Sequence, residues 1–187
     1  THLDFVHKTT LAGGENGVAA SLEVDIRDDV VHTRRVIHNS PPTAFHVAAT
    51  GDQGNIDRYQ LAEFRPPAHV VLTIGAEPAG MFPDMRTPNR LVINSCTPET
   101  ESSTHYFWSV TRAFALGDES ISRKIREMTY TAFDEDARML SHQQRMIESD
   151  RSGRPLTSFA SDRAATAARR ILARKLAAQQ GRYAAAE

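Results

Sequence analysis

The first half of the chain alternates between apolar and polar residues with the period of β-strands. Between positions 18 and 26 every second residue is apolar, which indicates a strand with one buried face. Asp28-Asp29 is a turn signal, and residues 30–37 form the expected return strand, in which residues 33–35 should lie on a solvated or edge face. Further strands are predicted at 56–64, 70–74, 91–96 and 106–112. We therefore expect about six antiparallel strands.

After Gly117 the period changes to that of a helix, which is predicted from about Ser120 to Ile147. Its apolar stripe consists of Ile121, Ile125, Met128, Ala132, Met139 and Met146. At about 100° per residue, Asp136 lies near the middle of this stripe, Glu135 lies near its edge, and Asp134 points the opposite way. A carboxylate on an apolar helix face is costly unless it is paired, protonated or bound to a metal. Asp136 is therefore either a paired or capping residue or a metal ligand.

A second amphipathic helix is predicted from Asp162 to about Gln180. Its apolar face contains Ala165, Ala168, Leu172 and Leu176. Its basic face contains Arg163, Arg169, Arg170 and Arg174, and we interpret it as solvated, with a docking surface for an acidic partner as the alternative. Strands followed by helices favour an α+β fold. We expect a curved antiparallel sheet with the long helix packed on it (a helix-grip, START-like arrangement) plus the final helix, and Asp136 facing the pocket between them.

Composition excludes several classes of function. The 187 residues suffice for a single domain, and the net charge of -1 gives no bulk attraction to nucleic acid or to an anionic membrane. No apolar run has the length of a membrane span. The single cysteine, Cys96, excludes an internal disulfide and any iron–sulfur or zinc site built from this chain's own cysteines. A cytoplasmic location is expected.

Two residues near the start could carry chemistry. If this stretch is helical, Asp4 and His7 lie on one face. A carboxylate often fixes the orientation of a metal-ligating histidine, so the pair is a candidate for a metal site. The alternative is a frayed terminus with two solvated polar residues.

Several segments in order resemble the catalytic domain of Rieske non-haem iron oxygenases, in the branch of vanillate O-demethylase and dicamba monooxygenase. They are Phe64-Arg-Pro-Pro-Ala-His-Val-Val, Thr97-Pro-Glu-Thr-Glu-Ser-Ser-Thr-His-Tyr-Phe-Trp, Phe133-Asp-Glu-Asp-Ala-Arg-Met-Leu-Ser-His-Gln-Gln and Ser161-Asp-Arg-Ala-Ala-Thr-Ala-Ala-Arg-Arg. The likeness runs nearly end to end. It implies a single catalytic-type domain over residues 1–187, truncated at its N-terminus.

The resemblance implies an iron(II) site of two histidines and one carboxylate. The family's first motif is Asp-x-x-His-x-x-x-x-His, so His7 would ligate the iron and Asp4 would bridge to a Rieske cluster on a neighbouring subunit. Asp136 would be the carboxylate ligand, in agreement with the helical phase. Asn94 matches a position that contacts substrate in the family, and an exposed strand residue is the equal alternative.

Two features depart from the family. The second histidine of the motif is replaced by Ala12, which cannot ligate a metal, so either the alignment shifts locally, His2 or His46 substitutes, or the site is incomplete. The cysteine and histidine motifs that bind the Rieske [2Fe–2S] cluster do not occur in the sequence. Any such cluster would lie outside this chain.

The expected function is that of the oxygenase component of an aromatic hydroxylase or O-demethylase. Its expected partners are an aromatic small molecule, dioxygen, a ferredoxin or flavin reductase and two further copies in a homotrimer. Two alternatives stay open, because the motif departs from the family. One is a metal-free helix-grip module that binds an apolar or aromatic ligand, and the other is a structural subunit of an oxygenase assembly.

Overall fold

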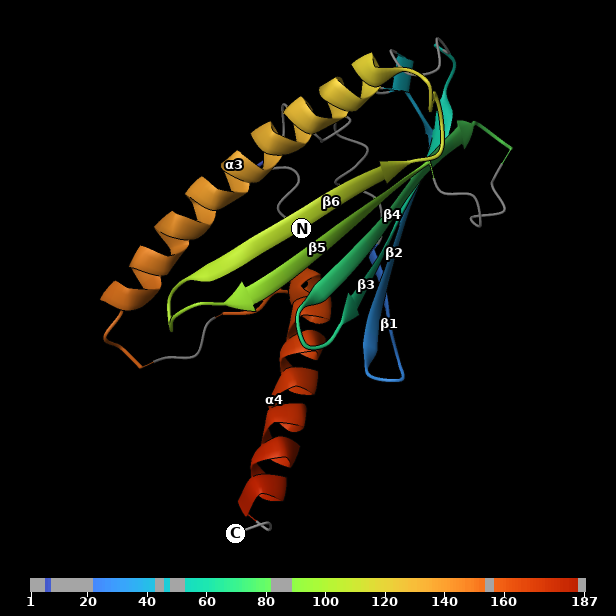
Figure 1. The fold of residues 1–187 in the computed structure, drawn as a ribbon. Helices are drawn as coiled ribbons and strands as arrows, with labels where there is room; N and C mark the ends of the chain where they lie inside the picture. Colours follow the sequence, from blue (N-terminus) through green and yellow to red (C-terminus); the bar gives the residue numbers. More distant parts are fainter. Residues whose placement is uncertain are drawn as a thin grey trace.

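The computed structural model describes residues 6–7, 22–42, 46–47, 53–81, 89–153 and 157–184. Of these, residues 182–184 are described by their backbone alone. Its strands are β1 (Leu22–Arg27), β2 (Val30–Ser40), β3 (Ile56–Arg65), β4 (His69–Pro78), β5 (Arg90–Pro98) and β6 (Thr104–Arg112). Its helices are α3 (Glu119–Ser149), the short 3-10 helix η1 (Ala160–Asp162) and α4 (Arg163–Ala184). Figure 1 shows a twisted sheet with α3 running beside β6 and α4 below.

All six described strands form one antiparallel sheet in the order β1-β2-β3-β4-β5-β6. This confirms the predicted strand number and the α+β class. The β1–β2 turn places Asp28 and Asp29 at φ 52° and 63°. Positive φ at both central residues suits a two-residue hairpin, because its twist then matches the twist of the strands. Asp28 and Asp29 therefore form the turn that the sequence predicted.

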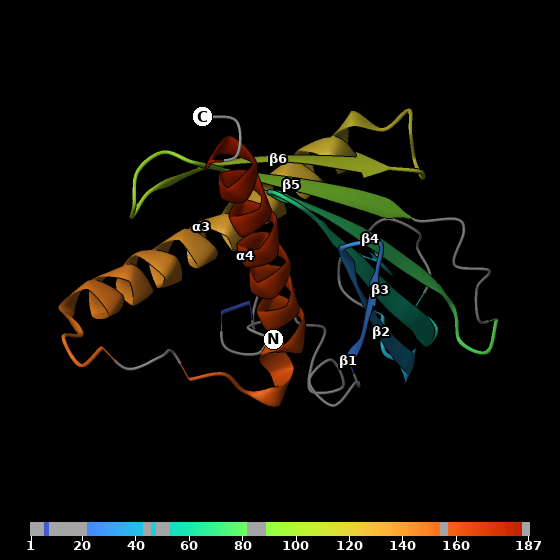
Figure 2. The same ribbon diagram turned by 90° about the horizontal axis from the view of Figure 1, so that it is seen from below.

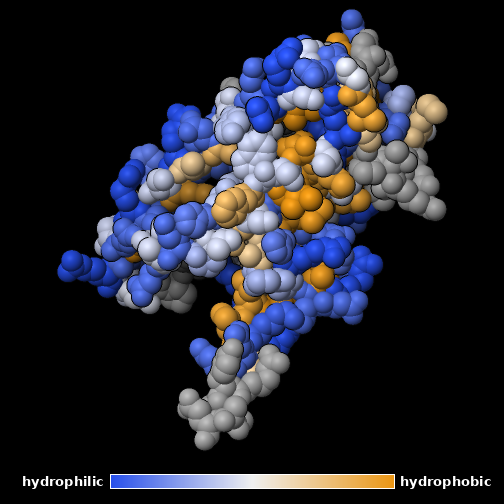
Figure 3. Space-filling view, viewed as in Figure 1, coloured by the Kyte–Doolittle hydropathy of each residue, from blue (hydrophilic) through white to orange (hydrophobic). Residues whose placement is uncertain are grey.

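One face of the sheet is turned toward α3, and we call it the helix-facing face. The Trp108 ring of β6 meets the rings of Tyr130 and Phe133 of α3 edge to face, at centroid distances of 5.2 and 5.4 Å. Residues paired across the strands share a face. By register the helix-facing face also contains the buried side chains Val31, Ile37, Ile56 and Val92. On the side of the molecule seen in Figure 1, the space-filling view shows a hydrophobic area over the strands (Figure 3).

The register corrects one prediction about β2. Residues 33–35 were expected on a solvated or edge face, but Arg35 lies opposite Gln60, which shares a face with Ile56. Thr33 and Arg35 therefore belong to the helix-facing face, and Arg34, which lies between them, to the opposite one. Alternation along a single strand cannot show which of its two faces meets the helix.

The helix α3 begins and ends within two residues of its predicted bounds. Asp118 caps it, with its carboxylate accepting a hydrogen bond of 2.8 Å from the Ser120 N–H. Ile121, Ile125 and Ala132 are buried as predicted. The prediction that the apolar stripe is buried was wrong beyond Asp136, because the C-terminal part of α3 extends past the strands (Figure 2). Met139 and Met146 are accordingly 49% and 70% exposed.

The final helix packs on the sheet over a shorter stretch than predicted. Its buried side chain is Ile171, whereas Leu176 of the predicted apolar face is 57% exposed. The basic face is only partly solvated, because Arg174 and Lys175 pair with Asp29 in the β1–β2 turn, the latter at 2.8 Å. These pairs dock α4 on its own chain. None of the described helices is long and apolar enough to cross a membrane.

Candidate metal centre

The imidazole of His7 lies between two carboxylates of α3. His7 Nε2 is 3.1 Å from Asp136 Oδ1, and His7 Nδ1 is 2.9 Å from Glu135 Oε2. His7 is 2% exposed, and the two carboxylate side chains are 27% and 20% exposed. The structure thus brings together His7 and Asp136, which lie far apart in the sequence and which an iron site would require side by side.

The helix directs both carboxylates inward through its periodicity. Glu135 and Asp136 follow the buried Ala132 by three and four residues, which is one helical turn. Asp134 points outward, is 67% exposed and pairs with Arg138 at 2.6 Å. The sequence placed Asp136 and Asp134 correctly, but missed that Glu135 reaches the same imidazole. The spacing from Ala132 was the signal that could have found it.

The arrangement fits a divalent metal ion on Nε2. When the Nδ1–H group of His7 donates a hydrogen bond to the Glu135 carboxylate, the lone pair of Nε2 is directed to the side of Asp136. Two adjacent ligands that each lie about 2.1 Å from one ion at a right angle are separated by about 3 Å. The observed 3.1 Å between Nε2 and Oδ1 fits this value. Imidazole nitrogen with carboxylate oxygen is also the donor set of non-haem iron(II) sites.

Other predicted site residues are placed as follows. Asp4, Ala12 and His2 lie outside the described residues. His46 is described and half-buried, yet no cluster of three or more potential metal ligands occurs within the described parts of the chain. His46 therefore does not complete a three-ligand set with His7 and Asp136.

An aromatic residue connects Asn94 to this centre. The Tyr106 hydroxyl donates a hydrogen bond of 2.7 Å to Asn94 Oδ1, and the Tyr106 ring meets Phe133 edge to face at 5.4 Å. Burial, with the negative charges of Cys96 and Asp136, raises the pKa of Tyr106 to about 12. Tyr106 is therefore a neutral hydrogen-bond donor at physiological pH. Asn94 lies on the helix-facing face as expected, and its contact with substrate stays a prediction.

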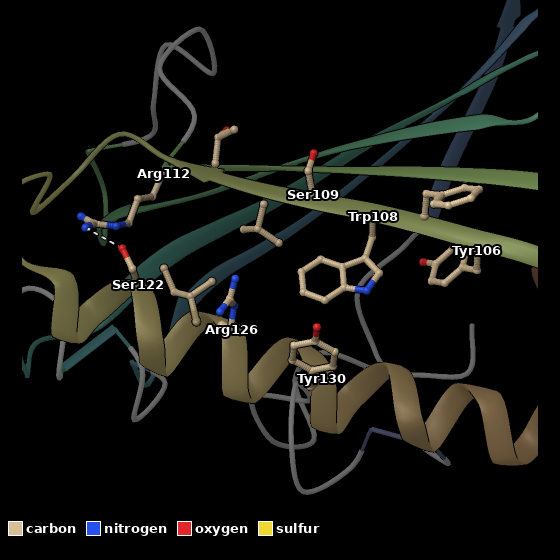
Figure 4. Close-up of a pocket in the computed structure, with 11 residues that line it drawn as sticks. Tyr106, Trp108, Ser109, Arg112, Ser122, Arg126 and Tyr130 are labelled. Carbon is tan, nitrogen blue, oxygen red and sulfur yellow. Dashed lines mark hydrogen bonds between the residues drawn. The ribbon is translucent and has the colours of Figure 1, made fainter.

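A groove of about 540 Å³ opens between β6 and α3 (Figure 4). Its lining residues are Tyr106, Phe107, Trp108, Ser109, Val110, Thr111, Arg112, Ser122, Ile125, Arg126 and Tyr130. Arg112 closes one end, where it donates to Ser122 Oγ at 3.1 Å. Four aromatic side chains line the groove: Tyr106, Phe107 and Trp108 from β6, and Tyr130 from α3. None of the lining residues is a carboxylate. The groove is open, and polar groups make up more of its lining than apolar ones.

The chain is similar in sequence to known oxygenase components. Residues 1–178 match the family described as "Vanillate O-demethylase oxygenase C-terminal domain". The chain is 32% identical over 97% of its length to a putative toluene-4-sulfonate monooxygenase system iron-sulfur subunit from Comamonas testosteroni, covering 54% of that protein. It is 31% identical over 96% of its length to a vanillate O-demethylase oxygenase subunit from Pseudomonas sp. (strain ATCC 19151), covering 57% of it.

A solved structure of dicamba monooxygenase bound to 3,6-dichlorosalicylic acid has a similar fold. It aligns with 95% of this chain at a TM-score of 0.83 and 20% identity, and the alignment covers 53% of the solved chain. The helix-over-sheet arrangement is therefore that of the solved protein. The chain spans about half the length of the curated relatives and of the solved structure that it matches.

Proposed function

Since the chain belongs to the family of vanillate O-demethylase oxygenase C-terminal domains, we propose that it is the part of an oxygenase component that holds a mononuclear non-haem iron. The observation that carries this proposal is the approach of His7 Nε2 to Asp136 Oδ1 at 3.1 Å beneath α3. Iron(II), when bound there, would supply open coordination positions for dioxygen. The reaction would be the oxygenation or O-demethylation of an aromatic small molecule.

Each residue of the centre has a distinct role in this proposal. His7 would bind the iron through Nε2, and Asp136 through its carboxylate. Glu135 would accept a hydrogen bond from the Nδ1–H group, which fixes the ring orientation and makes Nε2 the more basic nitrogen. Glu135 is thus a positioning residue rather than a ligand. A further ligand would come from outside the described residues.

The remaining parts of the proposal concern electrons and assembly. Asp4 would carry electrons from the [2Fe–2S] cluster of a neighbouring subunit in a homotrimer, and a ferredoxin or flavin reductase would reduce that cluster. One relative is named as a putative iron-sulfur subunit of a monooxygenase system, which supports a multi-component system of this kind. These roles follow from the family resemblance.

The substrate would lie against the aromatic wall of the sheet. Tyr106 and Trp108 lie on the helix-facing face, and Tyr106 is close enough to Asp136 for the carboxylate charge to raise its pKa. A ligand that lies against Tyr106 therefore lies near the metal centre. Asn94 would accept a hydrogen bond from a ring substituent, or donate one to it, after its hydrogen bond with the Tyr106 hydroxyl has rearranged.

Iron content after anaerobic reconstitution with iron(II) tests this function. We expect near-stoichiometric iron in the unaltered chain and its loss in Asp136→Ala, which removes a ligand. Asp134→Ala is the matched control, because it removes a solvent-facing carboxylate from the same turn of α3. Iron retained in Asp136→Ala, or absent from the unaltered chain, would contradict the proposal, and the absence would favour a metal-free ligand-binding module.

A further inference from the structure

Aromatic side chains form an unbroken series of ring contacts between β6 and α3. The Tyr106 ring meets the Phe133 ring at a centroid distance of 5.4 Å, and Phe133 in turn meets Trp108 at 5.4 Å. Trp108 also meets Tyr130, at 5.2 Å. All three contacts are edge to face, at distances typical of aromatic rings that touch. We call Tyr106, Phe133, Trp108 and Tyr130 the aromatic series.

The Tyr106 end of the aromatic series lies beside the candidate metal centre. Its neighbour Phe133 precedes Asp136 by three residues, which places both side chains on the same side of α3. Burial, and then the negative charges of Cys96 and Asp136, raise the pKa of Tyr106, in agreement with this placement. The series therefore begins next to the residues that would hold the iron.

The Tyr130 end of the aromatic series is open to solvent. Figure 4 shows Trp108 and Tyr130 between β6 and α3, with Tyr106 farther along the same strand. Tyr130 is 59% exposed. Tyr106 is less exposed, at 45%, and its hydroxyl donates a hydrogen bond of 2.7 Å to Asn94. A small molecule in solution can thus reach the series at Tyr130.

The members of the series differ in how easily they lose an electron. The phenol of tyrosine and the indole of tryptophan are the aromatic side chains that are most readily oxidised by one electron, whereas the ring of phenylalanine resists oxidation. Electron transfer slows steeply with distance and is fast between groups in contact. Tyr106, Trp108 and Tyr130 can therefore exchange electrons, and Phe133 fills the space between the first two.

We propose that Tyr106, Trp108 and Tyr130 form an electron-transfer path that leads from the metal centre to the surface of α3. This inference rests on the proposed function, because an oxygenase that reduces dioxygen without a substrate needs an outlet for the oxidant that results. The path would spare the side chains that hold the metal, since the oxidised residue would end at the surface.

Each step of this path moves one electron and one proton. Tyr106 would give an electron and its hydroxyl proton to a one-electron oxidant derived from dioxygen. Trp108 would then restore both to Tyr106 from its indole N–H, and Tyr130 would restore both to Trp108. The tyrosyl radical left on Tyr130 would take an electron and a proton from a small reductant in solution, such as ascorbate.

Pulse radiolysis of the metal-free 187-residue chain in azide solution tests this path. Azide radicals oxidise tryptophan in preference to tyrosine at neutral pH, and Trp108 is the chain's single tryptophan. We expect the absorption of the tryptophanyl radical to decay while that of a tyrosyl radical rises. The rate should not depend on protein concentration, because donor and acceptor belong to one molecule. A rate proportional to protein concentration would overturn the path.

Variants then identify the donors. The double variant Tyr106→Phe/Tyr130→Phe keeps both rings but removes the phenols, and it should abolish the transfer. Tyr59→Phe is the matched control, because Tyr59 is next to Gln60 on β3 and so lies on the opposite face of the sheet, and it should leave the rate unchanged. Thermal unfolding of each variant verifies that it is folded. Transfer at an unaltered rate in the double variant would overturn the proposal.

The direction of the path is tested in the iron-loaded chain. The chain is exposed to dioxygen and limiting ascorbate without an aromatic substrate, and catalase removes free peroxide. Peptide mass spectrometry should find oxygen added mainly to Trp108 and Tyr130. In Trp108→Phe, oxidation of Tyr130 should fall and oxidation of His7 should rise, because the path is interrupted. An equal oxidation of Tyr130 and His7 with and without Trp108 would overturn the path.

The outcomes separate this inference from the proposed function. If the chain binds iron but the tyrosines do not reduce the Trp108 radical within one molecule, the electron-transfer path is wrong and the oxygenase proposal stands. If Tyr106 and Tyr130 reduce that radical in the metal-free chain but no iron binds, the path stands and the oxygenase proposal is wrong.

Discussion

At the scale of single residues, the imidazole of His7 lies between two carboxylates that face different ring nitrogens. Asp136 faces Nε2 and Glu135 faces Nδ1. Sequence periodicity could identify Asp136, because a carboxylate in an apolar stripe is unusual. The spacing of Glu135 from the buried Ala132 could also have placed it on the inner face of the helix. The bond of Glu135 to His7 could not be predicted, since the two residues are 128 positions apart and only the fold brings them together. Nor could periodicity show that Arg35 faces the helix.

Glu135 offers the first test at this scale. We expect Glu135→Ala to weaken iron binding by about 10–100-fold, because the ring of His7 loses the acceptor that orients it. Glu135→Gln retains an acceptor oxygen and should restore most of the affinity. Iron titration under anaerobic conditions measures both. Equal affinity in the alanine variant and the unaltered chain would rule out the positioning role.

Tyr106 offers a second test. Its pKa is raised to about 12 by burial and by the negative charges of Cys96 and Asp136. Removing a negative charge makes the phenolate easier to form, so Asp136→Asn should lower this pKa. Tyrosine-labelled NMR titration of the metal-free chain measures it, and Asp134→Asn should leave it unchanged. An unchanged pKa in Asp136→Asn would show that the carboxylate does not face this side chain.

At the scale of elements, the positions of the strands could be predicted from the sequence. How far the buried face extends along each helix could not. Alternation predicted each strand of the described sheet, because an element half-buried along its length shows its period in the sequence. The exposed Met139 and Met146 continue the helical period of α3 beyond the sheet. Periodicity shows which face of a helix is apolar, but not how far a neighbouring element covers it.

The contact between the Tyr59 ring of β3 and Gly75 of β4 gives a prediction about stability. A Cβ atom added to Gly75 would lie 1.9 Å from the Tyr59 ring, which is 1% exposed. We therefore expect Gly75→Ala to lower the free energy of unfolding by about 1–3 kcal/mol, the usual cost of overpacking. Gly117→Ala, where nothing lies within 4 Å, is the control. Denaturant unfolding compares the two, and equal stability would contradict the packing described.

Asp57 gives a prediction about pH. Its buried carboxylate accepts hydrogen bonds from the backbone N–H groups of Asn39 at 2.8 Å and Gly80 at 3.1 Å, which join β2 to the end of β4. The bond from Asn39, followed by that from Gly80 and the charge of His38, lowers the pKa of Asp57 below its usual 3.8 despite burial. A lowered folded pKa stabilises the fold above pH 3.8, and this contribution disappears as pH falls toward the folded pKa.

Asp57→Ala should therefore lower the free energy of unfolding at pH 7 by about 1–3 kcal/mol, because two backbone donors lose their acceptor. The difference between the unaltered chain and the variant should shrink as pH falls below about 4. Denaturant unfolding at pH 7 and at pH 3 measures it. A difference that is constant or grows toward low pH would contradict the assignment.

At the scale of the whole molecule, α3 meets the helix-facing face of the sheet through aromatic side chains. The candidate metal centre lies on the same helix, at Glu135 and Asp136. The sequence could predict the architecture, because order and period of the elements determine it. Which side chains of neighbouring strands share the helix-facing face needed the strand register, which the sequence alone does not give.

The most direct test of the central claim is the paramagnetic signature of the iron itself. After anaerobic loading with iron(II) and addition of nitric oxide, the chain should show the signal of a high-spin ferrous nitrosyl with nitrogen coupling from a histidine. His7→Ala should lose that coupling, whereas His69→Ala, which alters an exposed histidine on β4, should retain it. A histidine-coupled signal that persists in His7→Ala, or no iron signal in the unaltered chain, would contradict an iron site at His7 and Asp136.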